Sequence, residues 1–155
     1  MAWSNSKIFM ATIEDLMENT TAVDLNSDTF KVALFDNSIT PSQTVASAST
    51  AYGAGVWASG GVVDAVSWPA VGRDLASVTS TFSSNVYTFD AADTASADAT
   101  TDLASVYGCL VYDDTITTPV ADQGLCYNYF GGSNSVVSGS FTVVWNSSGI
   151  LTITA

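Results

Sequence analysis

The chain has 155 residues, of which 47% are hydrophobic and only 12% are charged, and 15 acidic side chains against three basic ones give a formal charge of −12. This composition is too apolar for a disordered chain, yet no stretch approaches the roughly 18 apolar residues that a membrane-spanning helix needs. Because an acidic chain is repelled by phosphate backbones, the sequence predicts neither a nucleic-acid partner nor a membrane partner.

The length favours a single domain over residues 1–155 with its own hydrophobic core. We divide it into an N-terminal helix or arm over residues 1–20 and a β-sandwich over residues 28–155. The N-terminal segment lacks the basic start and apolar block of a signal peptide, because Glu14 and Asp15 interrupt its apolar residues. The sequence therefore predicts a protein that is made in a cytoplasm.

The first predicted element is a helix that ends near Asn19, where turn-forming and β-branched residues begin. Asn5 or Ser6 is its expected N-cap, because short polar side chains accept hydrogen bonds from free backbone N–H groups. Four apolar residues recur at helical spacing and should share one face: Phe9, Ile13, Leu16 and Met17. This face should pack either on the chain's own sheets or on a neighbouring molecule.

From residue 28 onward the pattern favours β-structure. Residues 30–35 place Phe30, Val32 and Leu34 on one side, and because the other side is also largely apolar, an inner strand is expected. Residues 45–61 are mostly small and are predicted to form a long loop with at most a short strand. Further strands are expected over residues 62–68, 75–82, 86–90, 103–114 and 124–130, with a polar loop over residues 91–102.

Residues 103–114 give the strongest strand prediction and should lie at the centre of a sheet, covered on both faces. Their side chains are expected to alternate, with Val106, Leu110 and Tyr112 facing one way and Tyr107, Cys109 and Val111 the other. At the end of the chain, residues 140–154 predict a β-hairpin, because two alternating stretches flank the turn sequence NSSG. Short strands about ten residues apart predict a mainly β fold: an antiparallel β-sandwich or partly open barrel with one short N-terminal helix.

The sequence contains no recognisable catalytic constellation. The chain has no histidine, which excludes the Ser-His-Asp and Cys-His arrangements. Its two cysteines, Cys109 and Cys126, lie in apolar runs and are predicted to be buried free thiols, since a zinc site usually needs four ligands. The sequence thus predicts a protein that is not an enzyme and that uses no cofactor and no metal.

Two groups of carboxylates have simple structural explanations. Asp113 and Asp114 are adjacent at a strand end and would point in different directions, so a turn is favoured over a pair that hydrolyses glycosidic bonds. Three others could offer oxygen ligands for calcium: Asp90, Asp93 and Asp98. Their spacing lacks the alternating acidic pattern of a calcium loop. The Gly-rich segment 130–135 lacks a phosphate-binding spacing and is predicted to be a turn.

The order of several motifs resembles small structural proteins of tailed bacteriophages. The predicted helix is followed by DTFKVALFDNSITPSQ, GRDLASVTSTF and FDAADTASAD, then by an apolar strand ending in YDD, the aromatic strand YNYFGG and a terminal Gly-turn hairpin. These motifs span nearly the whole chain, which in this respect is similar to head decoration and minor capsid proteins. The unusually Ala-, Ser- and Gly-rich segment 45–61 departs from the family pattern, in a region where related chains vary.

The resemblance implies a non-enzymatic virion protein that decorates the outer capsid surface and cements neighbouring capsomers. Its implied partners are the major capsid protein and further copies of the chain, with a trimer favoured, after synthesis in the cytoplasm of the bacterial host. Two alternatives stay open: a structural component of the tail or neck, and a carbohydrate-binding β-sandwich module.

Three aromatic side chains are the candidate interface residues: Tyr52, Trp57 and Trp68. Trp57 and Trp68 lie near Gly or Pro turns, and large aromatic side chains are enriched at interfaces. Together with the loop over residues 45–61 they could contact the capsid, or they could stack on sugar rings. In that case Trp57→Ala should weaken attachment without unfolding the protein. The alternative is that each indole folds back onto the core of its own chain.

Overall fold

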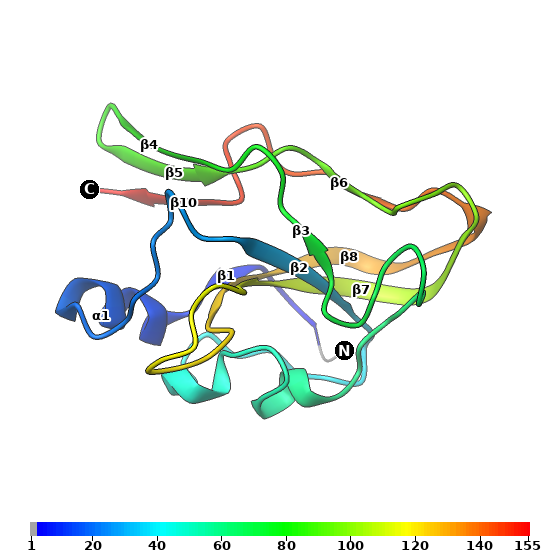
Figure 1. The fold of residues 1–155 in the computed structure, drawn as a ribbon, viewed down its shortest axis with the longest axis horizontal. Helices are drawn as coiled ribbons and strands as arrows, with labels where there is room; N and C mark the ends of the chain where they lie inside the picture. The colour runs from blue at the N-terminus through cyan, green and yellow to red at the C-terminus, as the bar shows by residue number, and fades with distance from the viewer. Residues whose placement is uncertain (1–2) are drawn as a thin grey trace.

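The computed structural model describes residues 3–155 and confirms the predicted mainly β class, because strands make up 39% of the chain and helices 10%. The strand pairs are antiparallel, and the sheets form a β-sandwich-like fold that is not closed into a barrel. Figure 1 shows two layers of strands, with the helix α1 at one end. Among the described residues, no helix has the length and apolar character to cross a membrane.

The larger layer is a five-stranded sheet with two long strands near its centre. Its order is β1 (Lys7–Ile8), β8 (Gly124–Gly139), β7 (Thr101–Asp113), β2 (Phe30–Phe35) and β3 (Arg73–Asp74). The predictions of an inner strand at β2 and a central strand at β7 are confirmed, since β7 pairs with β2 on one side and with β8 on the other. Because β8 extends to Gly139, the Gly-rich segment 130–135 is part of a strand and not a turn.

The smaller layer covers one face of this sheet and consists of two short sheets. One has the order β10 (Leu151–Thr154), β5 (Val86–Asp90) and β4 (Thr79–Ser83), and the other pairs β6 (Thr94–Ala95) with β9 (Thr142–Val143). The strand predicted over residues 86–90 is confirmed, and the one predicted over residues 75–82 begins later, at Thr79. In Figure 1 the hairpin of β4 and β5 projects beyond the larger sheet.

The hairpin predicted over residues 140–154 is wrong. Its two strands belong to different sheets, because β9 pairs with β6 while β10 pairs with β5. The expected turn does form, with the backbone N–H of Gly149 donating to the carbonyl of Asn146 at 2.8 Å. The chain then places Leu151 opposite Phe89, where both side chains are buried between the layers.

The strand predicted over residues 62–68 is also wrong. Asp64 and Trp68 exchange two backbone hydrogen bonds and close a tight turn, in which the Asp64 carboxylate accepts two further N–H groups of the turn itself. The backbone N–H of Asp102 binds the same carboxylate, and together these bonds lower the pKa of Asp64 to about 2. Hydrogen bonds from a local acidic side chain thus override the β-branched residues of this segment.

Bulges in β7 change which of its side chains share a face. The register with β8 shifts on both sides of Val106. Val106 therefore lies between the layers with Cys109, and Tyr107 lies on the opposite face with Leu110. The sequence predicted the reverse faces for Val106 and Tyr107, because strict alternation cannot accommodate a bulge. For residues 109–112 the predicted alternation is confirmed.

The helix α1 spans Met10–Glu18 and ends at Asn19, as predicted, where a φ of 56° caps its C-terminus. Its N-cap is Phe9, and the predicted caps Asn5 and Ser6 are wrong because the short strand β1 lies between them and the helix.

The helix packs on the chain's own sheets. Phe9 is fully buried, and the hydroxyl of Thr12 donates to the carbonyl of Gly124 at the start of β8, at 2.6 Å. Met17 does not belong to the packed face as predicted, since it is 83% exposed. The helix is thereby fixed to the larger sheet through its N-terminal half.

Two hydrophobic clusters lie on opposite faces of the larger sheet. The inter-layer cluster lies between the two layers and includes Phe30, Val32, Leu34, Trp68, Phe89, Val106, Cys109, Val111 and Leu151. The aromatic cluster lies on the other face and includes Trp3, Phe9, Phe35, Trp57, Leu110, Tyr112 and Tyr127. The loop predicted over residues 45–61 is confirmed, and its two 3-10 turns, η1 (Ser47–Ser49) and η2 (Gly55–Ala58), lie on this second face.

Candidate functional site

The two candidate tryptophans are buried in the core of their own chain. Trp57 is 2% exposed and belongs to the aromatic cluster, whereas Trp68 is 0% exposed and belongs to the inter-layer cluster, edge-on to Phe141 at 5.7 Å. In this conformation neither indole offers area to a capsid or to a sugar ring. The expectation that they are exposed contact residues is corrected accordingly, in favour of the alternative that the sequence left open.

Tyr52, the third candidate, is half-buried. Its ring stacks on Tyr112 at 4.9 Å with an interplanar angle of 11°, and its hydroxyl donates to the carbonyl of Ala70 at 2.8 Å. The structure does not bring the three candidates together, because Trp57 and Trp68 lie in clusters on opposite faces of the larger sheet. They therefore do not form one contact surface.

A different surface has the features of a binding site, namely the open side of the sandwich. At one edge of the larger sheet, the chain passes from β3 directly to β4 and so joins the two layers. At the opposite edge, β8 pairs with β1 only at Cys126 and Tyr127, and beyond them no described strand pairs with β8 on this side. A groove opens there between β8 and residues 141–152 of the smaller layer.

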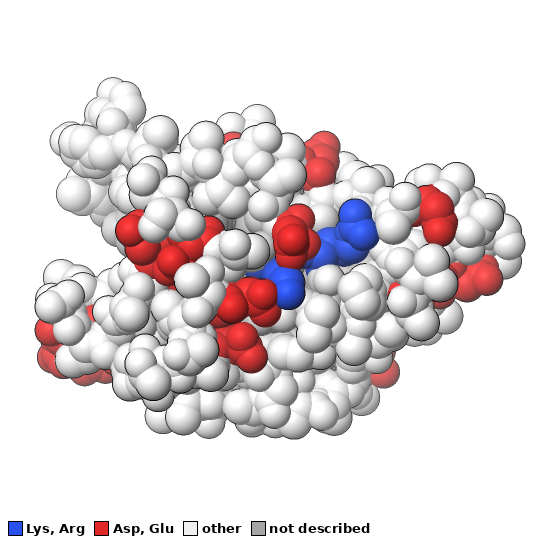
Figure 2. Space-filling model, in the orientation of Figure 1, with Lys and Arg blue, Asp and Glu red and all other residues white. Residues whose placement is uncertain are grey.

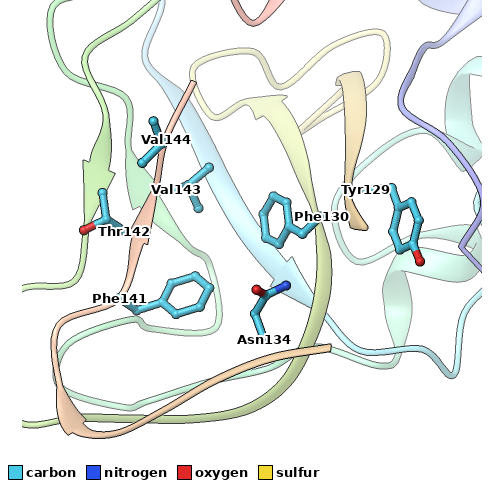
Figure 3. Close-up of a pocket in the computed structure, with 7 residues that line it drawn as sticks. All are labelled: Tyr129, Phe130, Asn134, Phe141, Thr142, Val143 and Val144. Carbon is cyan, nitrogen blue, oxygen red and sulfur yellow. The ribbon is translucent and has the colours of Figure 1, made fainter. Parts of the chain in front are cut away.

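Three adjoining hollows make up this groove. The first, of about 400 Å³, lies between β8 and β9. Figure 3 shows Phe130 of β8 and Phe141 pointing into it from opposite sides, with Asn134 between them. The second hollow shares Phe130 and runs to Ile150, and the third continues to Lys7 beside β10. The groove thus runs along β8 from its open edge near Asn134 to the part that β1 covers at Cys126.

Hydrogen bonds to β6 and its neighbours fix the smaller-layer wall of the groove. Phe141 and Ser96 are joined by two hydrogen bonds, from the N–H of Phe141 to Ser96 Oγ at 3.1 Å and from the N–H of Ser96 to the carbonyl of Phe141 at 2.8 Å. The N–H of Trp145 donates to the Asp93 carboxylate at 2.9 Å. Held at both ends, the segment presents Val144 to solvent, where it is 71% exposed.

The groove is uncharged except for Lys7 at its end. No acidic or basic residue occurs in residues 123–155, which supply β8, β9 and β10, so all 15 acidic side chains precede this part of the chain. A lining that mixes apolar and uncharged polar groups beside an open strand edge suits binding through apolar contacts and backbone hydrogen bonds. The uncharged run is a signal in the sequence that could have indicated this surface, which the aromatic candidates did not.

Most charged side chains lie elsewhere. Figure 2 shows a band of basic side chains at the centre of one face, flanked by acidic ones. Lys31 Nζ lies 2.7 Å from the carboxylate of Asp114, and burial, with the nearby Asp114 charge, raises the pKa of Asp122. Within residues 3–155 no group of three or more histidine, cysteine or acidic side chains is arranged to hold a metal ion.

Asp113 is the buried member of this acidic region. Its Oδ1 accepts the backbone N–H groups of Thr115 at 2.8 Å and Ile116 at 3.3 Å, which caps the bend after β7. Its Oδ2 is buried and has no hydrogen-bond partner among the described residues, and the carboxylate of Asp28 lies nearby. Burial above all, with Asp28 as a smaller cause, raises the pKa of Asp113 to about 7.

The other residues with candidate chemistry have structural roles. The carboxylates of Asp90 and Asp98 accept backbone N–H groups one and two residues further along the chain, at 2.9 Å each. The prediction of buried free thiols is confirmed. Burial raises the pKa of Cys109 well above its usual value and that of Cys126 to about 12, so neither thiol is poised to react.

Comparison with known proteins adds no relative. No protein-family model, no curated protein and no solved structure matches this chain. The resemblance to phage head proteins therefore rests on the sequence motifs, and any binding role has to be argued from the groove and the surfaces around it.

Proposed function

We propose that this chain is a non-enzymatic structural protein of a tailed-bacteriophage virion, which decorates the outer surface of the head and stabilises contacts between capsomers. Its partners in this role are the major capsid protein and further copies of the chain. The observation that carries the proposal is the groove beside the open edge of β8, which has aromatic and aliphatic side chains in its lining and, among the described residues, no charged side chain except Lys7, on a chain whose formal charge is −12. Such a surface suits contact with another protein.

The architecture supports a role that depends on surface contact. The central strand β7 is buried against a hydrophobic cluster on each face, so the sheet that carries the groove is firmly held. A protein present in many identical copies on one shell binds with high total avidity even where each contact is weak. A modest groove on a rigid body is therefore sufficient for a decoration protein.

A component of the tail or neck is the second candidate, because the same groove could serve a protein present in few copies. The third candidate, a carbohydrate-binding module, depended on exposed tryptophans that stack on sugar rings. Since Trp57 and Trp68 are both buried, the observation that favoured sugar binding is lost.

The test is the copy number of this chain in purified virions, relative to the major capsid protein, by quantitative mass spectrometry. We expect hundreds of copies in a simple ratio to the shell subunit. A handful of copies would move the assignment to the neck or tail. Complete absence from the virion would overturn the proposal.

A further inference from the structure

Two strands in different parts of the molecule have an open and unprotected edge. β4 is the outer strand of its sheet, and β8 has no described neighbour opposite β7 along residues 130–139. Proteins usually protect such edges with charged side chains or proline, because exposed backbone groups pair readily with another strand. Neither protection is present here, since residues 75–89 and 123–155 contain no charged residue and no proline.

The open edge of β4 borders an exposed apolar surface. Phe82 on β4 is 71% exposed, and the strand register places it beside Tyr87 of β5, which in turn lies beside Ile153 of β10. On the same face of this sheet, Phe89 and Leu151 are buried against the larger sheet. In Figure 1 the hairpin of β4 and β5 projects beyond the larger sheet. Phe82 lies on this hairpin, and the larger sheet does not cover its side chain.

The open edge of β8 borders an uncharged hollow with aromatic and aliphatic side chains in its lining. Phe130 and Phe141 form its sides, and the exposed Val144 lies at its rim (Figure 3). Its volume of about 400 Å³ is ample for one aromatic ring, since an apolar cavity of about 150 Å³ is known to bind benzene. One molecule thus presents a projecting phenylalanine and, elsewhere, a hollow of suitable size and polarity.

Electrostatics favour contact between copies through uncharged surfaces, and these two surfaces are of that kind. Each copy carries a formal charge of −12, so two copies repel one another across most of their surfaces. The tip of the β4–β5 hairpin, at the upper left of Figure 2, is free of charged side chains. The groove is built from the uncharged segment 123–155. Contact between hairpin and groove therefore brings two copies together through surfaces without charged side chains, apart from Lys7 at the end of the groove.

We propose that β4 of one molecule pairs with the open edge of β8 in a second copy, and that Phe82 enters the groove of that copy between Phe130 and Phe141. Because the two surfaces are different patches, the contact is head-to-tail, and its repetition closes a ring or continues as a filament. The inference builds on the proposed function, because it states how neighbouring copies interlock. Its test needs only the purified chain, so it can fail while the virion role stands.

The test is sedimentation analysis of the full chain at concentrations from about 1 μM to about 1 mM. Phe82→Asp removes the projecting apolar side chain, and Val144→Asp places a charge at the rim of the groove. Val66→Asp is the matched control, because Val66 is 78% exposed on a loop outside both surfaces. Exposed substitutions of this kind rarely unfold a protein, and circular dichroism with urea denaturation checks that each variant is folded.

The unaltered chain and Val66→Asp should self-associate as concentration rises, and each surface variant should weaken this association by about tenfold or more. An equimolar mixture of Phe82→Asp and Val144→Asp should form dimers and nothing larger, because one variant keeps an intact groove and the other an intact β4. The proposal is overturned if the unaltered chain stays monomeric throughout, if Val66→Asp is equally impaired, or if the mixture behaves as the sum of its two components.

Discussion

The two faces of the larger sheet are buried by different kinds of structure. On the inter-layer face the cover is a second layer of strands, where Phe89 of β5 meets Phe30 of β2 with ring centroids 4.9 Å apart. On the opposite face the cover comes from segments without long strands, which contribute Trp3, Phe9 and Trp57. A sheet covered on both faces thus needs no third sheet if loops and termini supply enough aromatic area.

The difference shows where contact with other molecules is possible. The aromatic residues of the loop over residues 45–61 pack against β2 and β7, so they contribute to the hydrophobic core of the chain itself. The smaller layer leaves one side of the larger sheet uncovered, and there the groove exposes aromatic and aliphatic side chains beside an edge of β8 that pairs with no described strand. The surface that we propose for interaction therefore lies at the open side of the sandwich, and not at the loop over residues 45–61 that carries the large aromatic side chains.

The largest expected loss of stability comes from removing the side chain at the centre of the aromatic cluster, which is Trp57. The indole of Trp57 lies within about 6 Å, between ring centroids, of four other rings: Trp3, Phe9, Phe35 and Tyr127. Trp57→Ala should lower the free energy of unfolding by about 3–5 kcal/mol in urea denaturation, because it leaves a cavity in a packed core.

The matched control for Trp57→Ala is Phe82→Ala, which removes an exposed ring and should change the free energy of unfolding by less than about 0.5 kcal/mol. This expectation replaces the one drawn from the sequence, in which Trp57→Ala leaves the fold intact. A loss of less than about 1 kcal/mol for Trp57→Ala would show that the loop over residues 45–61 does not belong to the folded core.

The strands could be predicted where the pattern is local. Residues 30–35 and 86–90 alternate within themselves, and the structure confirms both as strands. Strand pairing could not be predicted in the same way. The turn NSSG forms as expected, but Leu151 then meets Phe89, which lies far away in the sequence, and that long-range contact decides which sheet β10 joins.

The candidate site could be predicted only in part. A tryptophan beside a glycine or proline turn is free to fold inward or outward, and only contacts with distant residues buried Trp57 and Trp68. The absence of charge from residues 123–155 could be read directly from the sequence. The open edge could not, because it follows from the short length of β1, which covers β8 at only two positions.

A smaller loss of stability is expected if a side chain added to β7 displaces part of the aromatic cluster from the larger sheet. A Cβ at position 108 would lie 2.5 Å from the carbonyl oxygen of Asn128 and 2.6 Å from the indole of Trp3. Neither group can move without opening the β7–β8 pair or displacing the indole. Gly108→Ala should therefore lower the free energy of unfolding by about 1–3 kcal/mol, measured in urea.

Gly132→Ala on the same pair of strands is the control for Gly108→Ala. A Cβ at position 132 has no heavy atom within 4 Å, so the aromatic cover should not be disturbed. If the two variants lost equal stability, the close approach of Trp3 to β7 would be contradicted, and the effect would reflect only the general cost of changing a strand glycine.

The smallest expected effect is a change in the pH dependence of stability, and it concerns Asp113. This residue is the last one of β7, the strand that is packed against a hydrophobic cluster on each face. Burial raises its pKa to about 7, whereas an aspartate in an unfolded chain titrates near about pH 4. Between these values the folded protein holds a proton that the unfolded chain releases. The stability that Asp113 contributes is therefore fully present below about pH 4 and is lost as pH rises through about 7.

Asp113→Asn should reduce this pH dependence, because the amide cannot ionise. Between about pH 5 and about pH 8, the variant should lose about 1–2 kcal/mol less free energy of unfolding than the unaltered chain. Urea denaturation at both pH values measures the difference, with Glu18→Gln at the exposed end of α1 as the control. An unchanged pH slope in Asp113→Asn would mean that Asp113 is ionised throughout this range, and that burial does not raise its pKa.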